Sequence, residues 1–372
     1  GEMLKRIGVD GLDDLYADVP RSVIFDGDYD LPDAMSEMEV RRRFEELDRK
    51  NRHLTIMAGG GAYDHYAPAV VPALTSRSEY LTAYTPYQAE ISQGTLRYIF
   101  EFQSMIATLT GMDCANASMY DGATAAAEAM MMAMAATRKK TRVLLSSTLL
   151  PQVREVVHTY AKYHGVELSE IASADGQTDI DDARRLLEAG DVAGVLVPSV
   201  NRFGIVEDLS GFAEAAHAQK ALLMVYADPS ALAVVRTPGE WGADVACGDA
   251  QTLGIPLGFG GPYVGFLACS KEHVRKLPGR IVGATTDVDG KRAFVLTLQA
   301  REQHIRREKA SSNICCNQAL CAFAAGVYMA AMGEKGMKQC ARLCTSKAHY
   351  FASELEKIGC SLKYKGEFFH EF

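Results

Sequence analysis

Long charge-free apolar runs and long basic runs are both missing from this sequence of 372 residues. The richest apolar stretch, 123–136, contains Glu128, whereas a membrane-spanning helix needs about 18 or more apolar residues in a row. We therefore expect no membrane association. Without basic runs, and with a formal net charge of −8, the chain is also unsuited to a nucleic-acid partner. Proline is scarce, at 12 residues, and 48% of the residues are apolar, which predicts a globular protein with a large core.

Cysteine is present, but not in the pattern of a disulfide framework. The chain has nine cysteines, an odd number, at irregular spacing. Cys340 and Cys344 share one face of an expected helix, but no His or Cys pair follows nearby to complete a tetrahedral zinc site. We expect reduced thiols in a reducing cytoplasm, used mostly in packing, and no metal site.

Residues 1–60 combine scattered turn signals with one charged helical pattern, 36–50. Ser36 is suited to be the N-cap of this helix, and Glu39 stands three residues further on, as in a capping box. We interpret this region as an N-terminal surface arm. Because the chain opens with Gly1 instead of Met, we expect this end, like the other, to be a cut point rather than a natural terminus.

Residues 61–310 alternate between helical patterns and short apolar runs, which is typical of βαβ units. The alternation predicts a large α/β domain with a mostly parallel sheet covered by helices. One run, 263–269, follows its predecessor too closely for a crossover helix, so we expect it to be antiparallel. The expected helices are 95–110, 123–140, 151–164, 180–189 and 210–219, and the expected strands are 143–145, 193–197 and 221–227.

Residues 311–372 predict the start of a smaller α+β C-terminal domain. A charged helical linker, 298–309, leads into an apolar helix, 313–332. An amphipathic helix is expected from Lys335 onward, followed by the beginning of a strand at 361–364.

The first candidate site lies at the start of the Ala/Met-rich helix and consists of Asp121, Gly122, Ala123 and Thr124. Backbone N–H groups at a helix N-terminus bind anions, such as the phosphate of a nucleotide or of pyridoxal phosphate. The same residues also suit an ordinary helix cap, in which Asp121 or Thr124 accepts from these N–H groups. The Asp121 carboxylate would then repel a phosphate.

Asp228 follows the apolar run 221–227 and precedes Pro229. At the carboxyl end of a strand it lies where open α/β sheets bind their ligands. In a pyridoxal-phosphate enzyme such a carboxylate would protonate the ring nitrogen of the cofactor. An Asp-Pro that only forms a turn has the same sequence, so both interpretations stay open.

Lysine is missing where pyridoxal-phosphate chemistry would need one. The cofactor forms a Schiff base with an amine, and the loop after the next strand, 248–262, contains no lysine. The nearest lysine, Lys271, stands at the capped start of an expected surface helix. We do not expect it to be catalytic.

Two polar stretches complete the set of candidates. The region 59–93 is rich in Gly, Pro and Tyr, which is typical of loops that carry function. In the charge cluster 301–309, Arg301 or Arg306 could hold a substrate carboxylate with two hydrogen bonds, and Asn313 follows just beyond. A solvated, salt-bridged helix face is the alternative. Within the cluster, His304 is better suited to a structural hydrogen bond than to general-base catalysis.

Longer motifs in these stretches resemble the P-protein of the glycine cleavage system, namely 84–94, 120–124, 258–263 and 301–315. The resemblance runs from about Met3 to the end of the chain and is to the N-terminal half of that protein. In bacteria that split the enzyme into two chains, this half is subunit 1, the alpha chain of glycine dehydrogenase (decarboxylating), an oxidoreductase.

The resemblance implies the fold-type-I architecture of pyridoxal-phosphate transferases and an α₂β₂ enzyme. That enzyme removes CO₂ from glycine and passes the aminomethyl group to the lipoyl arm of H-protein. The Schiff-base lysine of the family lies in the second half, in a His-Lys-Thr motif. Here the matching residues are Gln251-Thr252-Leu253, so Thr252 stands in place of the lysine.

The expected cofactor, pyridoxal phosphate, would therefore be bound by subunit 2 and not by this chain. The pocket formed by the residues 121–124 and Asp228 would be vestigial. The chain would be inactive alone and would lend residues to the partner's active site. The candidates for this shared site are Tyr84, Thr85, Tyr87, Gln88, Arg301, His304, Arg306 and Asn313.

Two other interpretations are compatible with the sequence. The chain could be a scaffold or regulatory pseudo-enzyme that binds its partner through the N-terminal arm and adds nothing to the chemistry. It could also be an independent pyridoxal-phosphate enzyme, which would need a lysine outside the expected loop.

Overall fold

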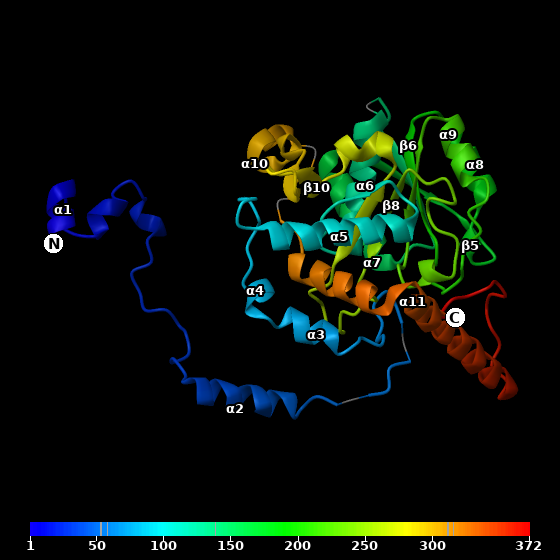
Figure 1. The fold of residues 1–372 in the computed structure, drawn as a ribbon, viewed down its shortest axis with the longest axis horizontal. Coiled ribbons are helices and arrows are strands. Elements are labelled where there is room, and N and C mark those ends of the chain that lie inside the picture. The colour runs from blue at the N-terminus through cyan, green and yellow to red at the C-terminus, as the bar shows by residue number, and fades with distance from the viewer. Residues whose placement is uncertain (53, 58, 138, 311, 315) are drawn as a thin grey trace. The chain divides into compact units, whose positions relative to one another are not determined.

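The computed structural model describes residues 1–52, 54–57, 59–137, 139–310, 312–314 and 316–372 (Figure 1). The contacts between residues divide the chain into two compact units, Gly1–Met57 and Ala58–Phe372. No helix in the described residues is both long and apolar enough to cross a bilayer. The further division expected at residue 311 stays a prediction.

The described residues of the first unit form helices and turns without a hydrophobic core. Its helix α2 begins at the predicted N-cap: the backbone N–H of Glu39 donates to Ser36 Oγ, and the Glu39 carboxylate accepts from the backbone N–H of Ser36 at 2.8 Å. None of the described residues of this unit is buried, although many are large and apolar, including Phe25, Tyr29 and Phe44. The helical elements are α1 (Glu2–Ile7), η1 (Asp13–Tyr16), η2 (Arg21–Val23) and α2 (Glu37–Asp48).

The second unit is built on a seven-stranded sheet with the strand order β1-β9-β8-β7-β6-β2-β3. The strands from β8 to β3 pair in parallel, whereas β9 is antiparallel to both β8 and β1. The mostly parallel sheet and the antiparallel direction of the run 263–269 are thereby confirmed. The strands are β1 (Cys114–Ala115), β2 (Arg142–Ser146), β3 (Glu167–Ile171), β6 (Val192–Pro198), β7 (Leu222–Tyr226), β8 (Val245–Asp249) and β9 (Gly265–Cys269).

Helices cover both faces of this sheet (Figure 1). Buried side chains alternate along the strands: in β6, Val195 and Val197 belong to one hydrophobic cluster and Leu196 to the other. The first cluster contains residues of α5, α8, α9 and α11, and the second contains residues of α6 and α7. The helices are α3 (Val70–Thr75), α4 (Ser78–Leu81), α5 (Gln93–Thr110), α6 (Gly122–Thr137), α7 (Pro151–His164), α8 (Ile180–Leu187), α9 (Phe212–Ala218) and α11 (Ala319–Lys357).

The charged segment before α11 differs from its prediction. Instead of one continuous helix it forms short helical turns, because Leu298 and Arg307 adopt positive φ angles that interrupt a helix. The apolar helix expected from residue 313 begins only at Ala319. The described residues 312–314 and 316–318 are not helical, and the side-chain amide of Asn317 donates to Ser118 Oγ at 2.8 Å. The turns are η5 (Gln299–Arg301), α10 (Gln303–Arg306) and η6 (Arg307–Lys309).

The C-terminal region is helical as expected, but its predicted strand is wrong. Gly333 adopts φ 58° and ψ −178° inside α11, and the amphipathic second half of the helix follows this kink. Residues 361–364 form no strand; instead Phe368 makes an isolated bridge with Ile205, and Phe369 is buried against Ala231. Burial of the two phenylalanines decides the course of this segment. The remaining elements are the hairpins β4 (Ser173–Ala174) with β5 (Gln177–Thr178) and β10 (Ile281–Thr286) with β11 (Arg292–Thr297), and the turns η3 (Ala231–Ala233) and η4 (Lys271–Lys276).

Candidate functional site

The carboxyl ends of β7 and β8 bring several candidate residues together. Asp228 lies two residues after β7, Asp249 is the last residue of β8, and Gln251 and Thr252 follow directly. Neighbouring parallel strands end at the same edge of a sheet, and ligands of open α/β sheets bind there. The sheet topology therefore defines a candidate site at this edge.

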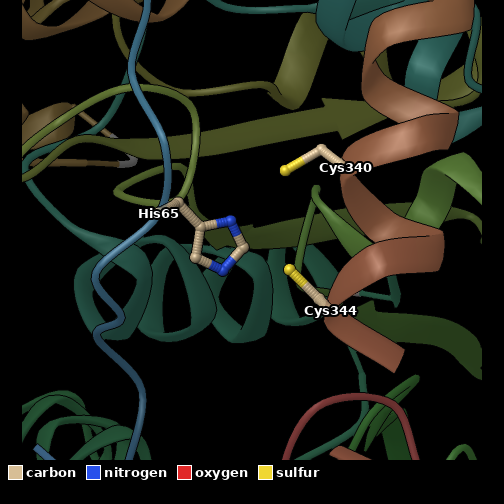
Figure 2. Close-up of side chains that lie close together, drawn as sticks. All are labelled: His65, Cys340 and Cys344. Atoms are coloured by element: carbon tan, nitrogen blue, oxygen red, sulfur yellow. The ribbon is translucent and has the colours of Figure 1, made fainter. Parts of the chain in front are cut away.

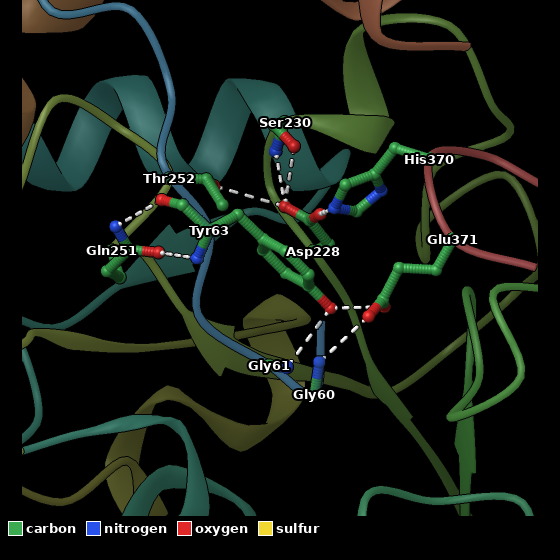
Figure 3. Close-up of polar contacts among 9 residues, drawn as sticks. All are labelled: Gly60, Gly61, Tyr63, Asp228, Ser230, Gln251, Thr252, His370 and Glu371. Carbon is green, nitrogen blue, oxygen red and sulfur yellow. Dashed lines mark hydrogen bonds and ion pairs between the residues drawn. The ribbon is translucent and has the colours of Figure 1, made fainter. Parts of the chain in front are cut away.

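Asp228 is held by donors from its own chain (Figure 3). Its Oδ1 accepts hydrogen bonds from Thr252 Oγ1 at 3.1 Å and from the backbone N–H and hydroxyl of Ser230 at 2.9 and 2.8 Å. Its Oδ2 is buried without a hydrogen-bond partner among the described residues, 3.9 Å from His370 Nε2. Asp228 thus lies beyond the carboxyl end of β7, where ligands bind, and its side chain also stabilises the turn through Ser230. The geometry is compatible with both the ligand-binding and the turn-forming interpretation.

The N-terminus of α6 is capped by two carboxylates. Asp121 Oδ1 accepts from the backbone N–H of Thr124 at 2.7 Å, which confirms the ordinary helix cap. Asp249 Oδ2 accepts from the backbone N–H of Gly122 at 2.9 Å. A Cβ atom on Gly122 would lie 2.6 Å from Asp249 N and from Tyr226 Oη, so this helix start is closely packed. Two of the N–H donors that a phosphate would need are thus already bonded to the carboxyl groups of Asp121 and Asp249.

Asp249 has an unusual electrostatic environment that the sequence analysis missed. Burial raises the pKa of Asp249 to about 7, although hydrogen bonds from the backbone N–H groups of Gly122 and Gln251 favour its charged form. The nearby carboxylates of Asp121 and Asp228 raise the pKa further. The position of Asp249 at the end of β8 was the only signal in the sequence that could have identified it.

Two segments that are distant in sequence close the pocket, and neither was predicted to contribute to it (Figure 3). The hydroxyl of Tyr63 donates to the Glu371 carboxylate at 2.5 Å, and the backbone N–H of Gly60 donates to the same carboxylate at 2.8 Å. The backbone of Tyr63 exchanges two hydrogen bonds of 2.8 Å with the side-chain amide of Gln251. Burial and the neighbouring Glu371 raise the pKa of Tyr63, and its ring packs edge-on against His370.

The space that remains at this site does not fit pyridoxal phosphate. The cavity lined by Tyr63, Asp228 and Thr252 has a volume of about 30 Å³. Pockets for small ligands and cofactors measure roughly 300 Å³ or more. Thr252 offers a hydroxyl instead of an amine, and at the start of α6 the N–H groups of Gly122 and Thr124 are already bonded to carboxylate oxygens. The pocket is therefore too small for the cofactor, it places carboxyl groups where the phosphate would lie, and it lacks an amine that could form the Schiff base.

The shared-site candidates form a more open region. Tyr84 is 79% exposed and Tyr87 is 52% exposed, in a loop without regular structure. Arg280 donates from Nη2 to the Tyr87 hydroxyl at 3.1 Å, and Arg301 donates from Nη2 to the carbonyl oxygen of Gly279 at 2.8 Å. The tyrosine loop and Arg301 thus converge on the consecutive residues 279 and 280.

Arg280 is the residue of this region that the sequence analysis missed. It is only 4% exposed, and its Nε is buried without a hydrogen-bond partner among the described residues. Its guanidinium group also lies over the Tyr87 ring, 5.5 Å from the ring centroid. No motif in the sequence marks this arginine, because its role depends on the contact with a loop nearly two hundred residues away.

The remaining candidates are used locally or exposed. Arg306 donates from Nε to the carbonyl oxygen of Ala300 at 2.9 Å, and His304 Nδ1 lies 3.6 Å from the Glu302 carboxylate. These contacts favour the structural interpretation of both residues. Thr85 is half-buried, whereas Gln88 and Asn313 are exposed.

The fold defines the class of protein. A sphingosine-1-phosphate lyase of Burkholderia pseudomallei superposes with a TM-score of 0.63 at 15% identity, covering 92% of this chain and 79% of that one. An alanine–glyoxylate aminotransferase from Nostoc superposes with a TM-score of 0.57 at 18% identity, covering 87% of this chain and 81% of that one. At identities this low, the superpositions show only that the fold is shared. The chain has the fold-type-I architecture of pyridoxal-phosphate enzymes, which confirms the predicted fold class.

More similar proteins identify the family. The chain matches the family model of the glycine cleavage system P-protein over residues 1–372. It is 54% identical over 372 residues to the "Probable glycine dehydrogenase (decarboxylating) subunit 1" of Moorella thermoacetica, covering 100% of this chain and 83% of the relative. The equally named protein of Desulforamulus reducens is 52% identical over 375 residues, with coverages of 100% and 84%. An inhibitor-bound crystal structure of glycine decarboxylase (P-protein) superposes with a TM-score of 0.91 at 44% identity, covering 99% of this chain and 83% of that one. The chain belongs to the P-protein family of the glycine cleavage system.

Proposed function

We propose that this chain is the subunit of a heteromeric glycine decarboxylase that does not bind the cofactor. The enzyme removes CO₂ from glycine and transfers the aminomethyl group to the lipoyl arm of H-protein. A second subunit supplies the Schiff-base lysine and holds the pyridoxal phosphate. The names of the similar proteins, which are subunits 1 of glycine dehydrogenase (decarboxylating), support this arrangement.

The observation that carries the proposal is the environment of Thr252. A hydroxyl cannot form a Schiff base with an aldehyde, so this position cannot anchor the cofactor. The Thr252 hydroxyl is instead bonded to Asp228. The cavity of about 30 Å³ next to it is closed by Tyr63 and His370 from the same chain. A chain with such a pocket can act in glycine decarboxylation only together with a partner that has an intact one.

The contribution of this chain to the partner's active site is assigned to the region around Tyr87. Its exposed tyrosines and the buried guanidinium of Arg280 combine aromatic surface with an incompletely paired positive charge. Aromatic residues and arginine are enriched where proteins meet their partners and anionic groups. We assign Tyr84, Thr85, Tyr87, Gln88 and Arg301 to the face that borders the partner's glycine site.

The exposed apolar side chains of the first unit favour an obligate partner. It carries many large apolar side chains but buries none of its described residues. A segment of this composition gains stability only when its apolar side chains are covered. Interfaces of obligate complexes bury on the order of 2,000 Å² or more. Residues 1–57 are therefore assigned to subunit association in an α₂β₂ assembly.

The proposal is tested by expressing this chain with and without subunit 2. Exchange of labelled bicarbonate into glycine, with H-protein added, should occur with the two subunits together and not with either alone. Borohydride treatment of the complex with pyridoxal phosphate should attach the cofactor to subunit 2. Exchange by this chain alone, or cofactor trapped on one defined lysine of this chain, would refute the proposal and favour an independent enzyme.

A scaffold without a part in the chemistry is the alternative that the coreless first unit also favours. The two functions differ in the effect of substitutions around Tyr87. In a scaffold, such variants bind subunit 2 and leave the exchange rate unchanged. In a shared active site, they bind subunit 2 normally and lower the exchange rate.

A further inference from the structure

Two cysteines and one histidine from distant parts of the chain come together beside the closed pocket. Cys340 and Cys344 lie four residues apart in the second half of α11, so their thiols project from one face of the helix. His65 lies in the segment that covers the pocket, and its ring is 5.8 Å from that of His370. Figure 2 shows the imidazole of His65 facing the two cysteines. The fold thus brings one histidine from outside the local sequence close to the two cysteines.

We propose that His65, Cys340 and Cys344 form a binding site for a thiophilic cation of the Zn²⁺ class. Two thiolates and one imidazole are ligands that Zn²⁺ prefers, and a water can take the fourth tetrahedral position. Ligand pairs at i and i+4 of a helix are also an established metal-binding spacing. Each thiol releases its proton to solvent as its sulfur binds the ion.

The distances are close to those of a tetrahedral site. The three donor atoms, one from each residue, lie within 4.8 Å of one another. Bonds of about 2.3 Å to sulfur and about 2.0 Å to nitrogen place tetrahedral ligand atoms about 3.5–3.8 Å apart, so side-chain adjustments of roughly 1 Å complete the site. All three residues are half-buried, which shields them from solvent but leaves the ion a path of entry.

A second observation supports a cation site at the same place. His65 Nδ1 is buried without a hydrogen-bond partner among the described residues, and so are both ring nitrogens of the neighbouring His370. Buried nitrogen atoms without partners are destabilising. Asp228, whose Oδ2 also lacks a hydrogen bond, interacts electrostatically with both His65 and Cys344. A positive ion beside this carboxylate would provide a ligand contact to His65 and partly neutralise the buried charge.

The ion would have a structural role in this chain. It would join α11 to the covering segment, in which Tyr63 binds Gln251 and Glu371 only two residues before His65. Metal bound to the folded chain alone stabilises it against unfolding. Loading would therefore hold the pocket closed. This inference concerns only the residues of this chain and does not depend on the proposed decarboxylase activity.

The test uses the full chain, reduced and freed of metal. It is titrated with Zn²⁺ against a chromophoric chelator and, separately, with Co²⁺, whose thiolate complexes give a charge-transfer absorption. We expect one equivalent of Zn²⁺ per chain, thiolate-to-cobalt absorption, and a higher unfolding temperature with metal. Cys340→Ser, Cys344→Ser and His65→Gln should each weaken Zn²⁺ binding at least tenfold. Cys321→Ser and Cys360→Ser are the matched controls and should bind as the unchanged chain does.

A second measurement separates loss of a ligand from loss of the fold. Each single cysteine variant should keep the far-ultraviolet circular dichroism of the unchanged chain and lose about half of the charge-transfer intensity per bound cobalt. The proposal is wrong if the unchanged chain gives no thiolate-to-cobalt absorption. It is equally wrong if the three ligand variants bind Zn²⁺ no more weakly than the two control variants.

Discussion

The closed pocket around Thr252 and the open loop around Tyr87 each combine residues that the sequence analysis singled out with residues that it missed, and the two regions differ in how far their side chains are exposed. In the pocket, the carboxylates of Asp228 and Asp249 accept hydrogen bonds from their own chain, and Tyr63 fills the space. In the loop, Tyr87 is about half exposed, and its hydroxyl accepts a hydrogen bond from the buried Arg280. Side chains that are buried and paired within the chain stabilise it, whereas exposed aromatic side chains are available to a partner. The same fold thus closes one region, and in our proposal it leaves the other open to subunit 2.

The largest effect is expected from the pH dependence of the pocket. With its pKa raised by burial to about 7, Asp249 keeps its proton to a higher pH in the folded chain than in the unfolded chain. Its contribution to stability is complete below about pH 4 and is lost as the pH rises through 7, which amounts to about 3 kcal/mol between pH 5 and pH 8. Urea denaturation at both pH values should show this loss. Asp249→Asn should remove it, whereas the exposed control Asp289→Asn should retain it.

Packing at the start of α6 should give the next largest effect. Gly122→Ala places a Cβ atom 2.6 Å from Asp249 N and Tyr226 Oη, and it should lower the free energy of unfolding by about 2–3 kcal/mol. Gly94→Ala is the matched control, because this glycine also lies in the first turn of a helix and has no atom within 4 Å of an added Cβ. The control should be neutral or stabilising by up to about 1 kcal/mol. Equal stability of the two variants would contradict the close packing of the pocket.

At the surface, the double variant Tyr87→Phe with Gln88→Ala should lower bicarbonate exchange by the two-subunit complex about tenfold, equivalent to ~1.4 kcal/mol. The substitutions remove the hydroxyl that accepts from Arg280 and an exposed amide, so the unfolding temperature of this chain should change little. Tyr163→Phe, at an exposed tyrosine of α7, is the control. Unchanged exchange in the double variant would remove this loop from the shared site.

Thr252→Val should have the smallest effect. In contrast to the double variant at the surface, it should lower stability and leave exchange unchanged. It deletes the hydroxyl that donates to Asp228, which should cost about 1 kcal/mol of stability. Exchange by the complex should stay at the level of the unchanged enzyme, and Thr252→Ser should restore stability. A loss of exchange that exceeds the loss of folded protein would show that the pocket still takes part in the reaction.

The sequence predicted the regular elements of the sheet and its helices well, because the spacing of apolar residues along them indicates which side chains are buried. The helix 151–164 has the predicted bounds, and the antiparallel strand at 263–269 was inferred from a short connection. The hairpin of β10 and β11 carried no prediction, and the strand expected at 361–364 is absent. Short apolar segments near a chain end do not report which surface they pack against, and that surface decides their conformation.

For the site, the sequence identified Asp228, Thr252 and the cap at Asp121, because strand ends, missing lysines and helix starts can be recognised locally. It missed Tyr63, Glu371 and the other groups that close the pocket. Their contacts span about 190 to 310 positions of the chain, and no local pattern encodes such pairs.

The sequence by itself determined the fold class, the family and the lack of an amine at position 252, since each depends on the identity or spacing of neighbouring residues. Only the tertiary structure decided that the pocket is filled, that Arg280 meets Tyr87, and that His65 meets Cys340 and Cys344. These features depend on volumes and distances between residues that the folded sheet and its covering segments bring together.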